Sequence, residues 1–135
     1  MKKILLSLIV LAGLGGFTAY KMWNKPHLNV AEAKAIVMKA EDLLDAFKND
    51  ETAAGTKFIN KVVAVTGNIS NVIKEGDQIT LQIETSDPMS NVICNLDQTA
   101  KQSRLTFNEG EAVQINGICS GYLSDVILDR CVVVK

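Results

Sequence analysis

The chain has 135 residues, enough for one domain and too few for two independent cores. Four of its 14 basic residues lie within residues 1–28, which contain no acid, so the rest of the chain carries ten basic against 15 acidic residues, a net charge of −5. A domain with this charge repels phosphate backbones at long range, which argues against a general nucleic-acid-binding protein.

Residues 1–28 are predicted to form a membrane anchor and a juxtamembrane linker. The run Ile4–Tyr20 contains no charged residue. As a helix it would reach about 26 Å, and Tyr20 and Trp23 stand where aromatic side chains meet lipid headgroups. A cleaved signal peptide is the alternative, although Gly13 and Gly15 fit the cleavage positions weakly. We expect an uncleaved anchor with the rest of the chain on the extracytoplasmic (periplasmic) side of the membrane.

Residues 29–60 are predicted to be helical. Asn29 and, three residues later, Glu32 match the capping-box pattern of a helix start. Apolar residues then recur at three- and four-residue spacing and form one stripe: Val30, Ala33, Ile36, Val37, Ala40, Leu43, Leu44 and Phe47. Charged residues occupy the other face. A second short helix is expected from Asp50 to about Phe58, with a break near Gly55.

From residue 61 the apolar period changes to two, which predicts five strands. The apolar positions are Val63, Val65 and Ile69; Ile79, Leu81 and Ile83; Val92, Cys94 and Leu96; Val113 and Ile115; and Val126, Leu128, Cys131 and Val133. A bulge near Asp129 and Arg130 would keep the last four on one side. Glu75-Gly76-Asp77 is a predicted turn, Gly121 is expected in the turn before the last strand, and the polar run Gln98–Leu105 is predicted to be a short surface helix.

Five short strands joined by tight turns avoid exposed edges by closing into a barrel. A short helix between the third and fourth strands is the OB-fold arrangement. We therefore predict an α+β, mainly β, fold. A five-stranded OB-type barrel over residues 61–135 is preceded by an amphipathic helix and an N-terminal transmembrane helix, and residues 29–135 form one folded unit.

Several segments resemble a known family: Lys61–Ile69, Val92–Cys94, Gly117–Tyr122, Asp125–Leu128 and Cys131. They are similar to the bacterial OB-fold family described as tRNA-anticodon-binding-domain-like (tRNA_anti-like). The juxtamembrane residues Tyr20–His27 are similar to membrane-anchored members of that family. The resemblance implies an OB barrel of unassigned function, because the name records a fold analogy and a fold does not carry function.

Chemistry-bearing residues are few. The single histidine, His27, stands beside the predicted anchor, and no CxxC pair exists, so we expect no metal site and no Ser/His or Cys/His mechanism. No Gly-rich phosphate loop follows a strand, so no cofactor is expected. The third and fifth strands of an OB barrel can run side by side in parallel, which makes Cys94 and Cys131 the better candidates for a disulfide; three buried thiols are the alternative.

A candidate ligand face is predicted on the second and third strands and the flanking loops. Its members are Lys74, Thr80, Gln82, Asn95 and Tyr122. This face is polar, uncharged to acidic and poor in stacking groups, which suits a protein, peptide or glycan better than DNA or RNA. The leading hypothesis is a membrane-tethered binding module without catalytic activity. The alternatives are an OB-fold single-stranded nucleic-acid binder and an envelope structural or assembly component that docks a partner through the apolar stripe of the helix.

Overall fold

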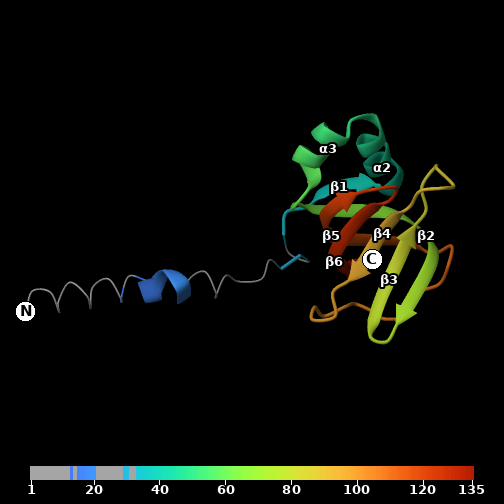
Figure 1. The fold of residues 1–135 in the computed structure, drawn as a ribbon. Helices are drawn as coiled ribbons and strands as arrows, with labels where there is room; N and C mark the ends of the chain where they lie inside the picture. The colour runs from blue at the N-terminus through green and yellow to red at the C-terminus, as the bar shows by residue number, and fades with distance from the viewer. Residues whose placement is uncertain (1–12, 14, 21–28, 31–32) are drawn as a thin grey trace, which may run out of the picture.

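The computed structural model describes residues 13, 15–20, 29–30 and 33–135. From residue 33 onward the elements are β1 (Ile36–Lys39), α2 (Ala40–Asn49), α3 (Glu51–Phe58), β2 (Val62–Glu75), β3 (Gln78–Ile83), β4 (Val92–Leu96), β5 (Ala112–Tyr122) and β6 (Val126–Val133). Strands β2, β3, β4, β6 and β5 follow one another around a barrel that β5 closes by pairing with β2 (Figure 1). The predicted five-stranded barrel is confirmed.

The long strand β2 pairs with two neighbouring barrel strands, one along each part of its length. Residues 62–68 pair with β5, and the strand pairs with β3 from Ile69 to its end. A register shift between Ile69 and Asn71 marks a bulge, which lets the strand bend from one neighbour to the next. Within the barrel β4 and β6 are parallel, as predicted, and the other neighbours are antiparallel.

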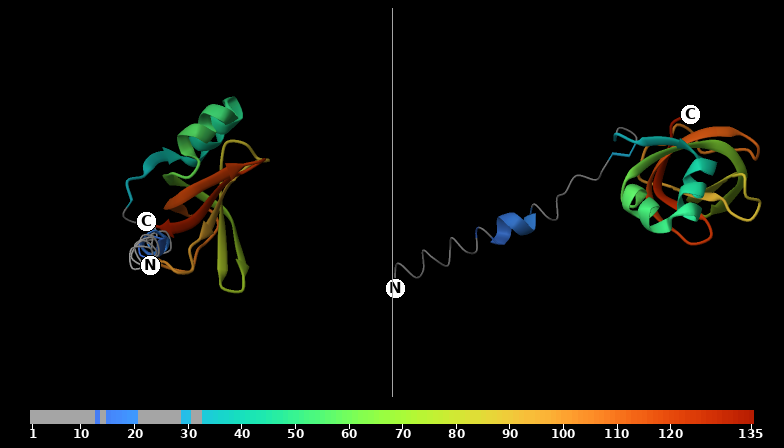
Figure 2. Two further views of the ribbon diagram at one scale, coloured as in Figure 1. Left: turned by 60° about the vertical axis from the view of Figure 1, so that its left-hand side comes forward. Right: turned by 90° about the horizontal axis from the view of Figure 1, so that it is seen from above.

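Helices α2 and α3 lie over one open end of the barrel, and the β2–β3 hairpin marks the other end (Figures 1 and 2). Leu43, Leu44 and Phe47 of α2 and Phe58 of α3 are at most 1% exposed. Burial of side chains of this size stabilises a fold by roughly 1.5–3 kcal/mol each. The apolar stripe of α2 therefore belongs to the core, and it cannot dock a partner as the assembly hypothesis requires.

The predicted helix begins at Ala40 rather than Asn29, because residues 36–39 form β1 instead. This strand runs parallel to the first half of β2, on the edge that β3 reaches only from Ile69 onward. Without β1, backbone groups on that edge would lack partners. The β-branched residues Ile36 and Val37 suit a strand. Pairing with β2 therefore overrides the helical spacing of the sequence.

The second helix is confirmed as α3, but the predicted break at Gly55 is wrong. The helix runs without interruption from Glu51 to Phe58. The Asp50 side chain accepts a hydrogen bond from the backbone N–H of Ala53 at 3.0 Å, which caps the helix start. A glycine inside a helix weakens it by about 1 kcal/mol, and the buried contacts of this short helix outweigh that cost.

The predicted surface helix Gln98–Leu105 is absent from the segment between β4 and β5, all of which is described. The Gln102 side chain donates to the carbonyl of Cys131 at 2.9 Å and accepts from the N–H of Val133 at 3.1 Å. The Ser103 hydroxyl donates to the carbonyl of Val133 at 3.2 Å. These bonds tie the segment to β6, and side-chain bonds to backbone compete with helix formation.

The last strand and its bulge are confirmed. Arg130 has a positive φ of 53°, the register with β5 shifts there, and Leu128 and Cys131 are both fully buried. The prediction for Gly121 is wrong, because this glycine lies inside β5 and the hairpin turns at residues 123–125. β5 is therefore longer at its end than the sequence pattern indicates.

The predicted anchor falls largely outside the described residues. Of this segment, Gly13 and residues 15–20 are described, and they are helical. Across the described part of the chain, no helix combines the length and the apolar character that crossing a bilayer requires. The membrane anchor stays a prediction.

Candidate ligand-binding face

The outer face of β3, β4 and β6 brings together three of the predicted site residues, Thr80, Gln82 and Asn95. Thr80 and Asn95 are direct partners across β3 and β4, and the Thr80 hydroxyl donates to Asn95 Oδ1 at 3.0 Å. The Asn95 amide then donates to Asp129 Oδ1 on β6 at 2.7 Å. We call Thr80, Asn95 and Asp129 the polar ladder. It fixes three side chains in one row across three strands.

Sequence reasoning missed Asp129 as a member of this face. The signal was present, because Asp129 directly follows the inward-facing Leu128 and successive strand residues point to opposite faces. The face also has an aliphatic part that was not predicted as such. Ile93 and Ile127 are half-buried partners across β4 and β6, and Gln82 lies opposite Ile93 on β3. Hydrogen-bonding and aliphatic groups thus lie side by side on the outer surface.

Lys74 and Tyr122 do not join this group, because they lie at opposite ends of the strands. Lys74 is exposed beside the β2–β3 turn. Tyr122 lies at the end of β5 near α2, where its half-buried ring stacks on Phe47 with the centroids 5.4 Å apart. One face of the Tyr122 ring is therefore covered, and Tyr122 does not lie with Thr80, Gln82 and Asn95. Phe47, Phe58 and Phe107 are all buried.

A cavity of about 540 Å³ lies beside Lys74, between the β2–β3 turn and the segment that follows β4. We call it the end cavity, because the β2–β3 turn that borders it lies at the barrel end opposite α2 and α3 (Figure 1). Its lining includes Lys74, Asp77, Ile79, Leu96, Asp97 and Leu105. Ile79 and Leu96 are the strand neighbours of Thr80 and Asn95, so the cavity adjoins the polar ladder.

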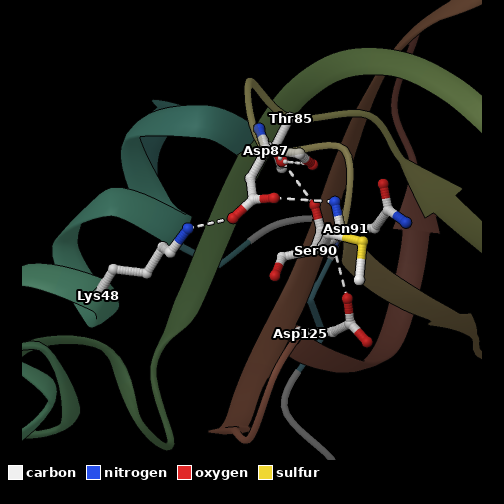
Figure 3. A network of polar contacts seen from close by, with 7 residues as sticks. Lys48, Thr85, Asp87, Ser90, Asn91 and Asp125 are labelled. Carbon is white, nitrogen blue, oxygen red and sulfur yellow. Dashed lines mark hydrogen bonds and ion pairs between the residues drawn. The ribbon is translucent and has the colours of Figure 1, made fainter.

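The opposite border of the face is held by a polar network around Asp87 (Figure 3). Asp87 forms an ion pair with Lys48 of α2 and accepts from the N–H of Met89 at 2.8 Å. The Lys48 hydrogen bond, followed by the Met89 N–H, holds the pKa of Asp87 below its usual value. The Asn91 N–H donates to Asp125 Oδ1 at 2.6 Å, which joins this loop to the β5–β6 turn. The network fixes residues 84–91 in place.

The three cysteines are buried free thiols in this structure. Burial raises the pKa of Cys119 to about 11 and that of Cys131 well above its ordinary value, with the neighbouring Cys94 thiol adding to the rise at Cys131. Protonated, buried thiols are poor nucleophiles. The parallel β4–β6 pairing that motivates a Cys94–Cys131 disulfide is confirmed, and the disulfide itself stays a prediction.

Among the described residues, no group of three or more His, Cys, Asp or Glu side chains is placed to hold a metal ion. The polar ladder contains one hydroxyl (Thr80), one amide (Asn95) and one carboxylate (Asp129). It therefore holds no ion pair that stands beside a nucleophile. What the face offers is a row of hydrogen-bonding groups next to aliphatic surface. Such a surface can bind a ligand through hydrogen bonds and apolar contacts.

Some solved structures resemble this one at low sequence identity. A proposed nucleic acid-binding lipoprotein from Klebsiella pneumoniae subsp. pneumoniae is 17% identical with a TM-score of 0.56, and the match covers 73% of this chain and 92% of that chain. The telomere capping protein Ten1 from Saccharomyces pombe is 16% identical with a TM-score of 0.43, covering 70% of this chain and 76% of that one. The likeness to the Klebsiella protein, at this identity, shows the fold alone.

No curated protein matches the chain. The family model described as tRNA_anti-like matches residues 1–133, nearly the whole sequence, and this agrees with the resemblance of its strand segments and with the closed barrel. The chain belongs to the tRNA_anti-like family.

Proposed function

We propose that this chain is a membrane-tethered, extracytoplasmic binding module without catalytic activity, and that its ligand is a protein or peptide. The observation that carries the proposal is the polar ladder with Ile93 and Ile127 beside it. OB barrels bind ligands on the face of their second and third strands, which here are β3 and β4. Surfaces that mix aliphatic area with hydrogen-bonding groups are typical of protein interfaces, and the aliphatic part favours a protein or peptide over a glycan.

The tether rests on the uncharged run Ile4–Tyr20. The absence of catalysis rests on the chemistry of residues 29–135, which contain no histidine. The three cysteines are fully buried, and the carboxylates of the site are exposed or bound to amides and ammonium groups. None of these groups has the partner that a nucleophile or a general base requires.

Single-stranded nucleic acid, the alternative left open from the sequence, is the second candidate, because the Klebsiella protein is described as nucleic acid-binding. Two features of this chain weigh against it. The ladder's one charged member is Asp129, an acid, whereas affinity for nucleic acid comes mainly from phosphate neutralisation by Lys and Arg. Base stacking adds roughly 1–3 kcal/mol for each exposed aromatic, and within residues 33–135 no aromatic side chain is exposed.

Site-directed photo-crosslinking in cells tests the proposal. A photoreactive amino acid replaces Gln82 on the ligand face or, as the matched control, Thr52, which is exposed on α3. We expect an adduct at position 82 that protease removes and nuclease leaves intact, and none at position 52. Equal labelling at the two positions, or an adduct at position 82 that nuclease removes, would contradict the proposal.

A further inference from the structure

The chain just before β1 packs against the outside of the barrel wall. We call its described residues, 29–30 and 33–35, the strap. Val30 is 3% exposed and forms a small apolar cluster with Val62 of β2 and Val132 of β6, and two strap alanines pack against this cluster. In Figure 1 the strap is cyan and meets the wall beside β6 before the chain enters β1. The strap therefore covers an apolar strip on the outer surface of the barrel.

Asn116 of β5 stands in the middle of this strip, paired with Ala64 of β2 on one side and with Val132 of β6 on the other. It is 7% exposed, and its side-chain amide donates to the carbonyl of Val30 at 3.3 Å. Its Oδ1 is bonded to the same carbon as the amide nitrogen, so it lies at the same interface, and it has no hydrogen-bond partner. In the part of the chain that the structure describes, no other buried side-chain nitrogen or oxygen lacks a partner. The strap supplies an acceptor to Asn116 but no donor, and an unpaired buried acceptor is costly.

The covered strip continues the ligand face. Asp129, the last member of the polar ladder, pairs with Ile118 of β5, and Ile118 packs against the cluster around Val30. Thr80, Asn95, Asp129 and Ile118 thus follow one another across four strands. An extended ligand that crosses these strands along the polar ladder therefore meets the strap at the end of the row.

We propose that the strap is an autoinhibitory segment, and that the protein or peptide ligand displaces it and binds Asn116 with an extended, aliphatic segment of its own. This inference rests on the proposed function and names the part of the partner that binds. An aliphatic side chain of the ligand takes the place of Val30 between Val62 and Val132. An extended backbone carries both C=O and N–H groups, so it can accept from the Asn116 amide and also donate to Oδ1. The ligand then pairs the acceptor that the strap leaves unpaired.

The contact that holds the strap is small enough for a ligand to displace it. Val30 is the only buried residue among the described residues of the strap, and alanine side chains bury little surface. The described strap residues also belong to no strand of the sheet. Every strand pairing of the barrel is therefore kept when the strap leaves the wall. A chain that binds its ligand only with the strap open has an apparent affinity reduced by the fraction of open chains.

Photo-crosslinking in cells with the full-length chain tests the inference, using the photoreactive residue at position 82 described above. Val30→Ser weakens the hold of the strap, so more chains have an open strip, and we expect the yield of the protein adduct to rise at least about threefold. Adding Asn116→Ala to Val30→Ser should lower the yield about fivefold, because both ligand hydrogen bonds are lost. A photoreactive residue at position 118 should capture the same partner, and more of it in Val30→Ser than in the natural chain.

Val37→Ser is the matched control, because it makes the same change at a valine of β1 that is 68% exposed, and it should leave the yield unchanged. The urea midpoint of each variant, read by far-UV circular dichroism, shows that the barrel is folded. A folded Val30→Ser chain that gives an unchanged or lower yield at position 82 would overturn the inference and leave the proposed function standing. Absence of a protein adduct at position 82 in the natural chain and in Val30→Ser alike would overturn both.

Discussion

Replacing Gly117 with alanine is expected to destabilise the barrel strongly. A Cβ at this position would lie 2.6 Å from Cys131 Sγ and 3.0 Å from Leu128 Cβ, both on β6. Ordinary van der Waals contact begins near 3.4 Å, so the sulfur would have to move by about 0.8 Å, the difference between 3.4 and 2.6. Both neighbours are fully buried and have nowhere to go. Overpacking of this kind costs about 1–3 kcal/mol, and two violated contacts place the expected loss at about 2–3 kcal/mol.

Urea unfolding of residues 29–135, followed by far-UV circular dichroism, measures this loss. Gly121→Ala on the same strand is the control, because its Cβ would meet nothing within 4 Å, and we expect a change within about 0.5 kcal/mol. In a Cys131→Ala background the sulfur is gone, so Gly117→Ala should cost at least about 1 kcal/mol less than it does alone. Two results would refute the pairing of β5 with the β6 bulge. One is that the losses of stability from Gly117→Ala and Cys131→Ala simply add in the double variant; the other is a Gly117→Ala protein as stable as the Gly121→Ala control.

Further predictions concern the polar network, the cysteines and the anchor. The pKa of Asp87 is lowered in the folded chain, so its contribution to stability is present above the ordinary carboxyl pKa of about 4 and is lost as pH falls through the lowered value; the protection factor of the Met89 amide against exchange should decrease over that fall, and in Asp87→Asn it should be lower already at neutral pH. If Cys94 and Cys131 form a disulfide, intact mass of the unreduced, denatured protein should show two thiols protected from alkylation until reductant is added, whereas three alkylated thiols would support the alternative of three buried thiols. Carbonate and high-salt washes should leave the intact chain in membranes because of the run Ile4–Tyr20, and recovery of a shortened soluble form would show cleavage instead.

The strands could be predicted because each has one buried face. Ile79, Leu81 and Ile83 alternate with polar residues, and all three are buried. The bulge in β6 could be predicted for the same reason, since the apolar phase switches between Leu128 and Cys131 and both must face the core. Apolar residues at every second position indicate that one face of the strand is buried, and each strand of a barrel has one face toward the core.

The elements that sequence reasoning missed depend on distant partners. The residues of β1 fit a helix stripe and a strand equally well, and the open edge of β2 decides between them. The run Gln98–Leu105 looks helical, but Gln102 bonds to β6, about 30 residues later in the chain. Local patterns carry no information about such pairings.

The candidate site shows the same division. Thr80 and Asn95 lie together as expected, because they point outward on neighbouring strands. Tyr122 lies away from them, because its environment depends on Phe47, which lies on α2 far away in the sequence. The end cavity could not be predicted, since part of its lining comes from the segment Gln98–Leu105, for which the sequence predicts a helix that does not form. Outward residues of strands are therefore more predictable than residues at barrel ends, where loops and helices pack.

The central claim is that the ligand is a protein or peptide and not a nucleic acid. One binding measurement tests this claim without knowledge of the partner. Fluorescence anisotropy of labelled mixed-sequence single-stranded DNA and RNA is recorded with the full-length chain at low and physiological salt. Because the domain is acidic and no aromatic of residues 33–135 is exposed, we predict no binding tighter than about 10⁻⁴ M at physiological salt, the weak end of non-specific affinity. Micromolar binding at physiological salt that Lys74→Ala or Asn95→Ala abolishes would contradict the account and make the outer face of the barrel a nucleic-acid site.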